Sequence, residues 1–329
     1  MSWKAYLALC AFSLVLRPAH AYGIARSSTP CNNSPSLCSR SYDNVTYLGA
    51  HDSPFVRDAS TSYSASGNQY YNSTVQLSAG VRLLTAQVQL QGSALHVCHS
   101  SCDLLDAGPL STWLAEVRSW MESNTNEVVT ILLVNGASAS VQELAQQYEA
   151  AGITTSLAYT PTGSDAQSQE WPTLQSMIDS GKRLVNFVDY IGDNSDAPYI
   201  MPEFSYIFEN PYDVTSASGF VCGINRPPSE NGSTPTQVIA QGVMPLMNHF
   251  LYQDIGLGIQ SPDVDAIDTT NAPDGGVGSL GYSASQCSEQ YGRAPSFLLV
   301  DFFNVGPTID VADRLNGVSS PVGRTSAPA

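Results

Sequence analysis

The fold is decided by one stretch near the start of the chain, Val45-Thr46-Tyr47-Leu48-Gly49-Ala50-His51-Asp52-Ser53-Pro54. Its first half is apolar, as in a strand that is buried on both faces. Its second half is polar and ends in a proline, which is typical of a loop. His51 therefore follows the end of a buried strand, where an α/β barrel builds its active site. The alternative is a histidine that only caps the strand end by hydrogen bonds to the backbone.

Similar strands recur along the chain with helical segments between them, which is the pattern of an α/β fold. Further strands are expected at residues 81–90, 94–99, 127–135, 183–190, 244–252 and 297–304, and helices at 110–123, 141–151, 174–180 and 311–315. Several strands are continuous apolar runs, as expected when helices cover the sheet. Polar segments rich in Gly, Ser, Pro and Asn are expected to be surface loops at 24–40, 160–170, 226–236 and 269–286.

The first 21 residues have the composition of a signal peptide. Lys4 precedes an apolar run at residues 5–16, and Ala19-His20-Ala21 matches a small-x-small cleavage pattern. The run is shorter than the roughly twenty residues of a transmembrane helix. We therefore expect a secreted, extracellular protein without a transmembrane segment, with one domain at residues 22–315 and a flexible C-terminal tail at 316–329.

The chain is strongly acidic. It has 13 Lys and Arg against 29 Asp and Glu, a formal net charge of −16, and loss of Lys4 and Arg17 with the signal peptide leaves 11 against 29, or −18. Such a surface repels polyanions, which argues against nucleic acid as a partner and against a basic patch for anionic membranes. The expected partner is a small-molecule or lipid substrate, and the oligomeric state stays open.

Six of the seven cysteines remain after the signal peptide is removed, and an even number in a secreted chain favours three disulfides. Sequence proximity pairs Cys31 with Cys38 and Cys98 with Cys102, which leaves Cys222 for Cys287. Four Asn-x-Ser/Thr sequons indicate a glycoprotein and are expected on the surface, at Asn32, Asn44, Asn72 and Asn231.

The mature chain keeps four histidines, so few side chains can titrate near neutral pH. His96 and His99 share one short strand, where alternation puts them on opposite faces, so only one of them can face a site. A zinc site built from these histidines and the neighbouring cysteines is disfavoured, because thiols in an oxidising compartment form disulfides. His249 is expected to be a hydrogen-bonded residue of the core.

The stretch 48–53, Leu-Gly-Ala-His-Asp-Ser, resembles the Gly-Thr-His-Asp-Ser stretch of the phosphatidylinositol-specific phospholipase C X-domain family. Segments 80–84, 95–99, 126–133 and 297–304 resemble later barrel strands of that family in the same order. The likeness covers most of the mature chain and extends to the fungal secreted branch. It implies a TIM-type (β/α) barrel, complete or distorted, of the phospholipase C-like phosphodiesterase kind.

The resemblance also implies roles for individual residues. In this family one histidine takes the proton of the attacking hydroxyl and a second protonates the leaving oxygen. Position gives the first role to His51 and the second to His99, with His96 as a substitute. Asp301 would orient His51. Asp52 matches either a second carboxylate or, in metal-dependent members, a calcium ligand.

The chain departs from the family on the second strand, where bacterial members carry Asp-x-Arg and metal-dependent members Glu-x-Asp. Here the sequence is Thr85-Ala86-Gln87, and Val134-Asn135 stands where a later acidic ligand is expected. Gln87 can bind substrate by a hydrogen bond but brings no charge, and a cation would have to come from elsewhere, for example from Arg57 or Arg183. No cofactor is expected, because the acidic ligands of calcium are unmatched.

Three functions stay open at this point. The first is a phosphodiesterase acting on a phosphoinositide or a related lipid headgroup, which the two strand-end histidines favour. The second is a catalytically silent barrel that binds a lipid headgroup or a glycan, which the missing arginine favours. The third is a glycosidase with Glu209 and Asp301 as its two carboxylates.

Overall fold

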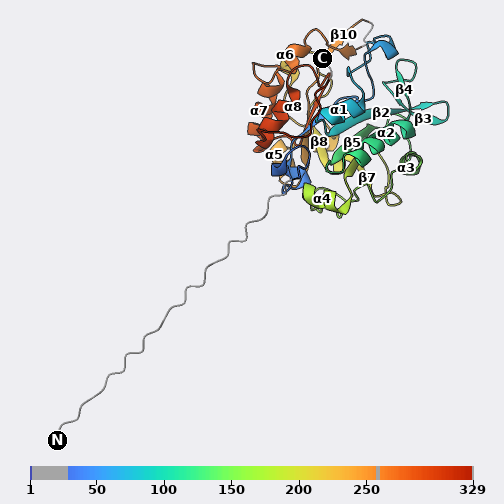
Figure 1. The fold of residues 1–329 in the computed structure, drawn as a ribbon. Helices are drawn as coiled ribbons and strands as arrows, with labels where there is room; N and C mark the ends of the chain where they lie inside the picture. The colour runs from blue at the N-terminus through green and yellow to red at the C-terminus, as the bar shows by residue number, and fades with distance from the viewer. Residues whose placement is uncertain (2–28, 257–259, 328–329) are drawn as a thin grey trace.

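The computed structural model describes Met1 and residues 29–256 and 260–327 (Figure 1). The predicted signal peptide lies outside these residues, apart from Met1. Among the described residues, each helix is too short or too polar to span a lipid bilayer.

Eight parallel strands form the centre of the molecule. In sheet order they are β7 (Ile200–Pro202), β6 (Leu184–Val188), β5 (Val129–Val134), β2 (Leu83–Gln91), β1 (Tyr47–Ala50), β12 (Phe297–Val300), β9 (Met244–Asn248) and β8 (Ile207–Glu209). In the described part of the chain no strand pairing joins β7 to β8, so the barrel is open at this seam. The predicted (β/α) barrel is confirmed in its distorted form.

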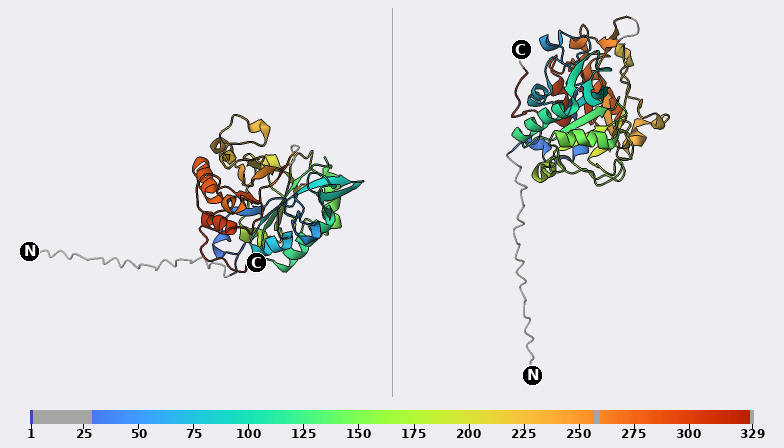
Figure 2. Two further views of the ribbon diagram at one scale, coloured as in Figure 1. Left: turned by 90° about the horizontal axis from the view of Figure 1, so that it is seen from above. Right: turned by 90° about the vertical axis from the view of Figure 1, so that its right-hand side faces the viewer.

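The helices lie outside this sheet (Figure 2). They are α1 (Ser73–Ala79), α2 (Leu110–Ser123), α3 (Val141–Ala150), α4 (Leu174–Ser180), α5 (Pro235–Ile239), α6 (Ile267–Thr270), α7 (Leu280–Tyr291) and α8 (Thr308–Asn316). The long strand β2 also pairs with β3 (Ala94–Cys98), which with β4 (Asp106–Pro109) forms an arm beside the barrel. A separate hairpin joins β10 (Tyr252–Asp254) to β11 (Gln260–Pro262).

The first and last barrel strands are neighbours. Tyr47 pairs with Phe297 and Ala50 with Val300, in parallel register. Because side chains alternate along a strand, and because Tyr47 and Phe297 stack on each other inside the barrel, every second residue after them also points inward. The next such positions beyond the strand ends are His51 and Asp301.

Aromatic side chains fill the interior at the amino-terminal ends of the strands. The Tyr42 ring lies 4.7 Å from that of Trp171 and 5.2 Å from that of Tyr47, centroid to centroid. Further along β1 the interior position is Gly49, where a Cβ atom would lie 2.8 Å from the side chains of Leu83 and Leu299. This packing closes one end of the barrel, so a cleft can form only at the carboxyl ends of the strands.

Two predicted segments differ from the structure. The strand expected at 244–252 is two strands, β9 and β10, because the chain leaves the barrel after Asn248. The loop expected at 269–286 contains most of α7, whose buried face consists mainly of small residues. Its inward positions Leu280, Ala284 and Cys287 follow helical spacing, and tertiary packing rather than propensity stabilises such a helix.

The three predicted disulfides are confirmed: Cys31–Cys38, Cys98–Cys102 and Cys222–Cys287. The surface prediction for the sequons is wrong for Asn32, which is 5% exposed and exchanges two hydrogen bonds with the backbone of Val128. Within the segment expected as a flexible tail, several described residues contact the barrel domain. Thr325 donates a backbone hydrogen bond to Ser78, and Arg324 pairs with Asp313.

Candidate active site

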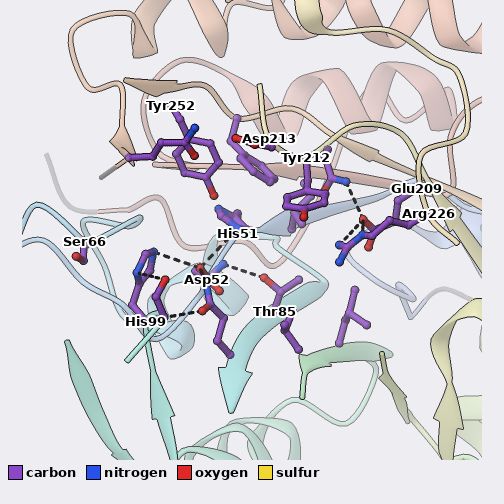
Figure 3. A pocket seen from close by; sticks show the side chains of 18 of the residues that line it. His51, Asp52, Ser66, Thr85, His99, Glu209, Tyr212, Asp213, Arg226 and Tyr252 are labelled. Atoms are coloured by element: carbon purple, nitrogen blue, oxygen red, sulfur yellow. Dashed lines mark hydrogen bonds and ion pairs between the residues drawn. The ribbon is translucent and has the colours of Figure 1, made fainter. Parts of the chain in front are cut away.

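A cleft of about 540 Å³ opens at the carboxyl ends of the barrel strands (Figure 3). Inward-facing residues of β2, β5, β8, β9 and β12 line it, together with the loops that follow β1 and β3. Leu132 and Leu299 form part of its apolar lining, and the side chains of His51, Asp52 and His99 gather at one end.

His51 is held from two sides. Its Nδ1 lies 2.8 Å from Oδ1 of Asp301, and because a carboxylate only accepts, Nδ1 carries the proton. Asn68 donates to the same carboxylate oxygen at 3.0 Å. The imidazole also stacks on the Phe250 ring at a centroid distance of 3.8 Å. These contacts fix the ring and leave Nε2 facing the cleft.

The protonation of His51 depends on its acidic neighbours. Burial alone would lower its pKa, but the charges of Asp52 and Asp301 outweigh burial and raise the pKa above 6.5. Burial raises the pKa of Asp301, although the ion pair with His51 opposes that effect. Since the two groups are in direct contact, we take them as an ion pair at pH values near 6.5.

His99 reaches the cleft from the arm. The Cys98–Cys102 disulfide closes the turn after β3, and His99 packs edge-on against the Phe55 ring. Burial lowers the pKa of His99, and the attraction of Asp52 does not compensate. The environment therefore drives the pKa values of the two cleft histidines in opposite directions.

Asp52 lies between the two imidazoles. Its Oδ2 is 3.6 Å from Nε2 of His51 and 3.6 Å from Nε2 of His99, so the two nitrogens are no farther apart than the sum of these distances. Both contacts are too long for hydrogen bonds. The same oxygen accepts a 2.7 Å hydrogen bond from Nε2 of Gln87, and the backbone amide of Asp52 donates to the Thr85 hydroxyl.

A second polar group lies toward the β8 side of the cleft. Arg226 donates to Oε2 of Glu209 from Nε at 2.9 Å and from a terminal nitrogen at 2.5 Å. The guanidinium carbon of Arg226 lies 4.4 Å from the centroid of the Tyr212 ring, which covers it. Behind them Glu203 is buried, and burial raises its pKa well above 4.5. Arg226 is thus a cleft residue whose charge is already paired.

The structure brings together five of the predicted site residues: His51, Asp52, Gln87 and His99 line the cleft, and Asp301 supports His51 from behind. The other two predicted site residues, His96 and Arg57, lie outside the cleft. His96 lies on the opposite face of β3, where its Nδ1 is 3.0 Å from both carboxylate oxygens of Asp106. Arg57 is absent from the lining of the cleft.

His249 and Arg183, which the sequence also offered as candidates, lie outside the cleft as well. His249 is fully buried and bonds through Nε2 to the Thr270 carbonyl at 2.9 Å, as expected of a core residue. Arg183 donates to backbone carbonyls, including that of Glu127, at the far end of β5. It is therefore not available to a substrate.

Several residues of the site were not predicted from the sequence, among them Asn68, Arg226 and Tyr252. Tyr252 is the first residue of β10, which follows β9 after a short connection, and Arg226 lies in the loop after β8. The alternation that puts Leu246 and Asn248 inside the barrel could have indicated the side of β9 that faces the cleft. It could not have predicted Arg226, because β8 is only three residues long and no periodicity continues into the loop.

Among the described residues, one group has the spacing of a metal site, His96, Cys98 and Asp106. Cys98 is in a disulfide, so its sulfur cannot act as a thiolate ligand. In the cleft, Asp52 is the carboxylate nearest the two histidines, and the neighbouring strand positions offer Thr85 and Gln87 rather than further carboxylates. The donor set does not fit calcium, which prefers several carboxylate and carbonyl oxygens.

An incomplete parallel barrel with two histidines and two carboxylates at its carboxyl end belongs among the phospholipase C-like barrels. A family model described as PI-PLC X 1 matches residues 37–316. The chain therefore belongs to the PI-PLC X-domain family.

Two relatives from the fungus Arthroderma benhamiae agree with this. The chain is 37% identical over 313 residues to an uncharacterized secreted protein, covering 92% of this chain and 68% of the relative. It is 35% identical over 289 residues to PI-PLC X domain-containing protein 1, covering 88% of this chain and 90% of the relative.

Solved structures show the same fold at low identity. Phosphatidylinositol-specific phospholipase C from Listeria monocytogenes matches with a TM-score of 0.52 and 13% identity, covering 86% of this chain and 95% of that one. A mutant of the Staphylococcus aureus enzyme matches with a TM-score of 0.52 and 13% identity, covering 84% and 94%. At this identity the likeness concerns the fold alone.

Proposed function

We propose that the protein is a secreted phosphodiesterase that cleaves a phosphoinositide or a related lipid headgroup by general acid–base catalysis with two histidines. One observation carries the proposal: Nε2 of His51 and Nε2 of His99 face the same cleft, each 3.6 Å from the same oxygen of Asp52. Secretion is supported by the predicted signal peptide, by the three disulfides and by the relative described as secreted.

The chemistry follows from the two nitrogens. Nε2 of His51 takes the proton of a substrate hydroxyl, and the freed oxygen forms a bond to phosphorus. The bond from phosphorus to the leaving oxygen breaks, and that oxygen takes the proton of His99. The products are a cyclic phosphodiester and a free alcohol. Asp301 stabilises the imidazolium that His51 becomes, and Nδ1 stays the donor to Asp301 throughout.

The side chains of the cleft do not by themselves hold the protons in the arrangement that this reaction needs. The pKa of His51 is raised and that of His99 is lowered, so a single proton resides mainly on His51. A phosphodiester bound between the rings brings a negative charge to His99 and favours its protonation. Substrate binding would thus help to move the proton from the base to the acid.

The two histidines can be told apart by the leaving group. A phosphodiester of a vicinal diol with a 4-nitrophenolate leaving group needs no acid, because nitrophenolate leaves without a proton. We expect His51→Ala to lose activity on this substrate and on an alkyl diester, and His99→Ala to lose activity mainly on the alkyl diester. His96→Ala, outside the cleft, is the matched control. Wild-type activity of His51→Ala would refute the assignment, and the reverse rescue pattern would exchange the two roles.

A second candidate is a barrel that binds such a headgroup without turnover. Within the described residues the cleft presents no unpaired arginine or lysine to a phosphate, since Arg226 is bound by Glu209. Wild-type protein that binds a phosphodiester and releases no product would favour this candidate. The glycosidase alternative has less support, because Asp301 lies behind His51 and does not line the cleft.

A further inference from the structure

The phosphodiester chemistry needs hydrogen-bond donors for the non-bridging oxygens, on which negative charge builds up. Two obvious donors of the cleft are already used. Gln87 donates to Asp52 at 2.7 Å, and its own oxygen accepts from the backbone amide of Ser100 at 2.8 Å. Arg226 directs two nitrogens at Glu209. The imidazoles are committed to proton transfer, so the donor has to come from another side chain.

Tyr252 has the required position. It is the first residue of β10, four residues after Asn248 at the end of β9. Its ring packs edge-on against the Phe250 ring at a centroid distance of 5.6 Å. The ring centroid is 6.4 Å from that of His51. In Figure 3 the phenol oxygen points into the cleft toward His51. Within the described chain this hydroxyl makes no hydrogen bond, so it is free to bind a ligand.

The hydroxyl also keeps its proton. Burial raises the pKa of Tyr252 well above 10, and the negative charges of Asp301, Asp52 and Asp213 act in the same direction. At any pH at which the histidines could work, the phenol is a donor. It is neutral, so it adds no charge to the cleft, unlike the arginine of the bacterial members.

We propose that Tyr252 is a catalytic residue whose hydroxyl donates a hydrogen bond to a non-bridging oxygen of the phosphoryl group, and that this bond strengthens in the transition state. The inference rests on the proposed phosphodiesterase function and deepens it. It explains how a cleft with Thr85 and Gln87 on the second strand can still stabilise phosphoryl charge. The hydroxyl approaches from the side of β9, whereas the arginine of bacterial members comes from the second strand.

Tyr252→Phe tests the inference, because it removes the hydroxyl and keeps the ring against Phe250. With sonicated phosphatidylinositol vesicles, or with the nitrophenyl diester, kcat should fall on the order of a hundredfold while KM changes by less than about threefold. Tyr282→Phe on the outer helix α7 is the matched control and should leave both constants unchanged. An unchanged kcat in Tyr252→Phe would overturn the inference.

Anion binding gives a readout that does not need turnover. Inorganic phosphate and vanadate, titrated calorimetrically, should bind the Tyr252→Phe protein roughly fivefold to tenfold more weakly than wild type, as expected for one lost hydrogen bond. If wild type cleaves no diester but shows this difference, the proposed function fails and the phosphoryl contact of Tyr252 is supported. Equal affinity in both proteins, or no binding to wild type, would overturn the contact.

Discussion

Nδ1 of His51 lies 2.8 Å from Oδ1 of Asp301, although 250 residues of chain separate them. The contact depends on the register of β1 against β12, in which Ala50 faces Val300 and the next residue of each strand turns inward. A shift of the strand register by one residue would turn one of the two side chains outward, toward the helices. The contact between His51 and Asp301 therefore depends on the strand pairing of the barrel as well as on the motif around His51.

The Asp301→Asn variant removes the charge of Asp301 and keeps the size of its side chain, so it tests the contribution of the charge to the pair. The amide can still accept from Nδ1, but the charge that raises the pKa of His51 is lost, so this pKa should fall. Because the charge also stabilises the imidazolium formed in the reaction, kcat should fall on the order of a hundredfold or more. NMR titration of the ring and steady-state kinetics measure the two effects. Asp310→Asn on α8 is the control, and an unshifted His51 would contradict the ion pair.

The opposite pKa shifts of the two histidines predict a bell-shaped dependence of kcat/KM on pH. The acidic limb should lie below pH 6.5 and belong to His99, and the alkaline limb should lie above pH 6.5 and belong to His51. Asp301→Asn should move the alkaline limb to lower pH and leave the acidic limb in place. A profile with one limb, or one in which both limbs move together, would argue against two independent histidines.

The resemblance to the PI-PLC X-domain family was sufficient for the barrel fold and for the contact between His51 and Asp301, although β7 and β8 were not among the predicted strands. The resemblance assigns the two residues to the first and last strands, and barrel topology makes those strands neighbours. Two of the disulfides followed from sequence proximity, and the third joins the two cysteines that remained. The alternation of His96 and His99 left one histidine for the cleft, and the structure shows that it is His99.

The rest of the cleft could not be predicted, for physical reasons. Arg226 and Tyr252 reach it from loops, and a loop has no periodicity that relates a residue to a face. Gln87 is at an inward position of β2, but only the structure shows that both ends of its amide are used within the protein. Helix α7 was not predicted, because Gly281, Ser283 and Ala284 on its buried face are too small to produce a clear apolar periodicity.

Gln87 should act as a positioning residue. Its amide joins Asp52 to the backbone of Ser100 next to His99, and so couples the two histidine loops. Gln87→Met keeps the length of the side chain and removes both hydrogen bonds, so kcat should fall roughly tenfold, with a shift of the acidic limb. Gln89→Met, two residues along β2, is the control. Loss of affinity for inorganic phosphate with an unchanged pH profile would instead point to substrate binding by Gln87.

His249 should make the protein sensitive to acid. Burial lowers its pKa from 6.5 to about 4, so in this range the unfolded chain binds a proton that the folded chain excludes. Stability should therefore fall as the pH drops from about 6.5 to 4, by about 3 kcal/mol at pH 4 from this residue. Urea unfolding at pH 7 and pH 4 should show a smaller difference between the two pH values in His249→Gln. An equal difference in wild type and variant would exclude His249 as the cause.

Calcium should have little effect on turnover. A calcium ion at Asp52 would need several further oxygen ligands. On β2 the Thr85 hydroxyl accepts from the Asp52 amide, and the Gln87 oxygen accepts from Ser100. At the end of β5, the Asn135 side chain exchanges hydrogen bonds with the backbone of Ala139. The oxygens at the positions of the family's acidic ligands are neutral and already engaged.

We therefore expect turnover in chelator and in millimolar calcium to differ by less than about twofold, and calorimetry to detect no calcium binding in the cleft. Asp52→Asn distinguishes the two roles of this carboxylate. If Asp52 acts on the histidines, the variant should be slower in chelator and in calcium alike, and the pKa of His51 should fall. A strong stimulation of wild type by calcium that disappears in Asp52→Asn would show instead that Asp52 is a metal ligand.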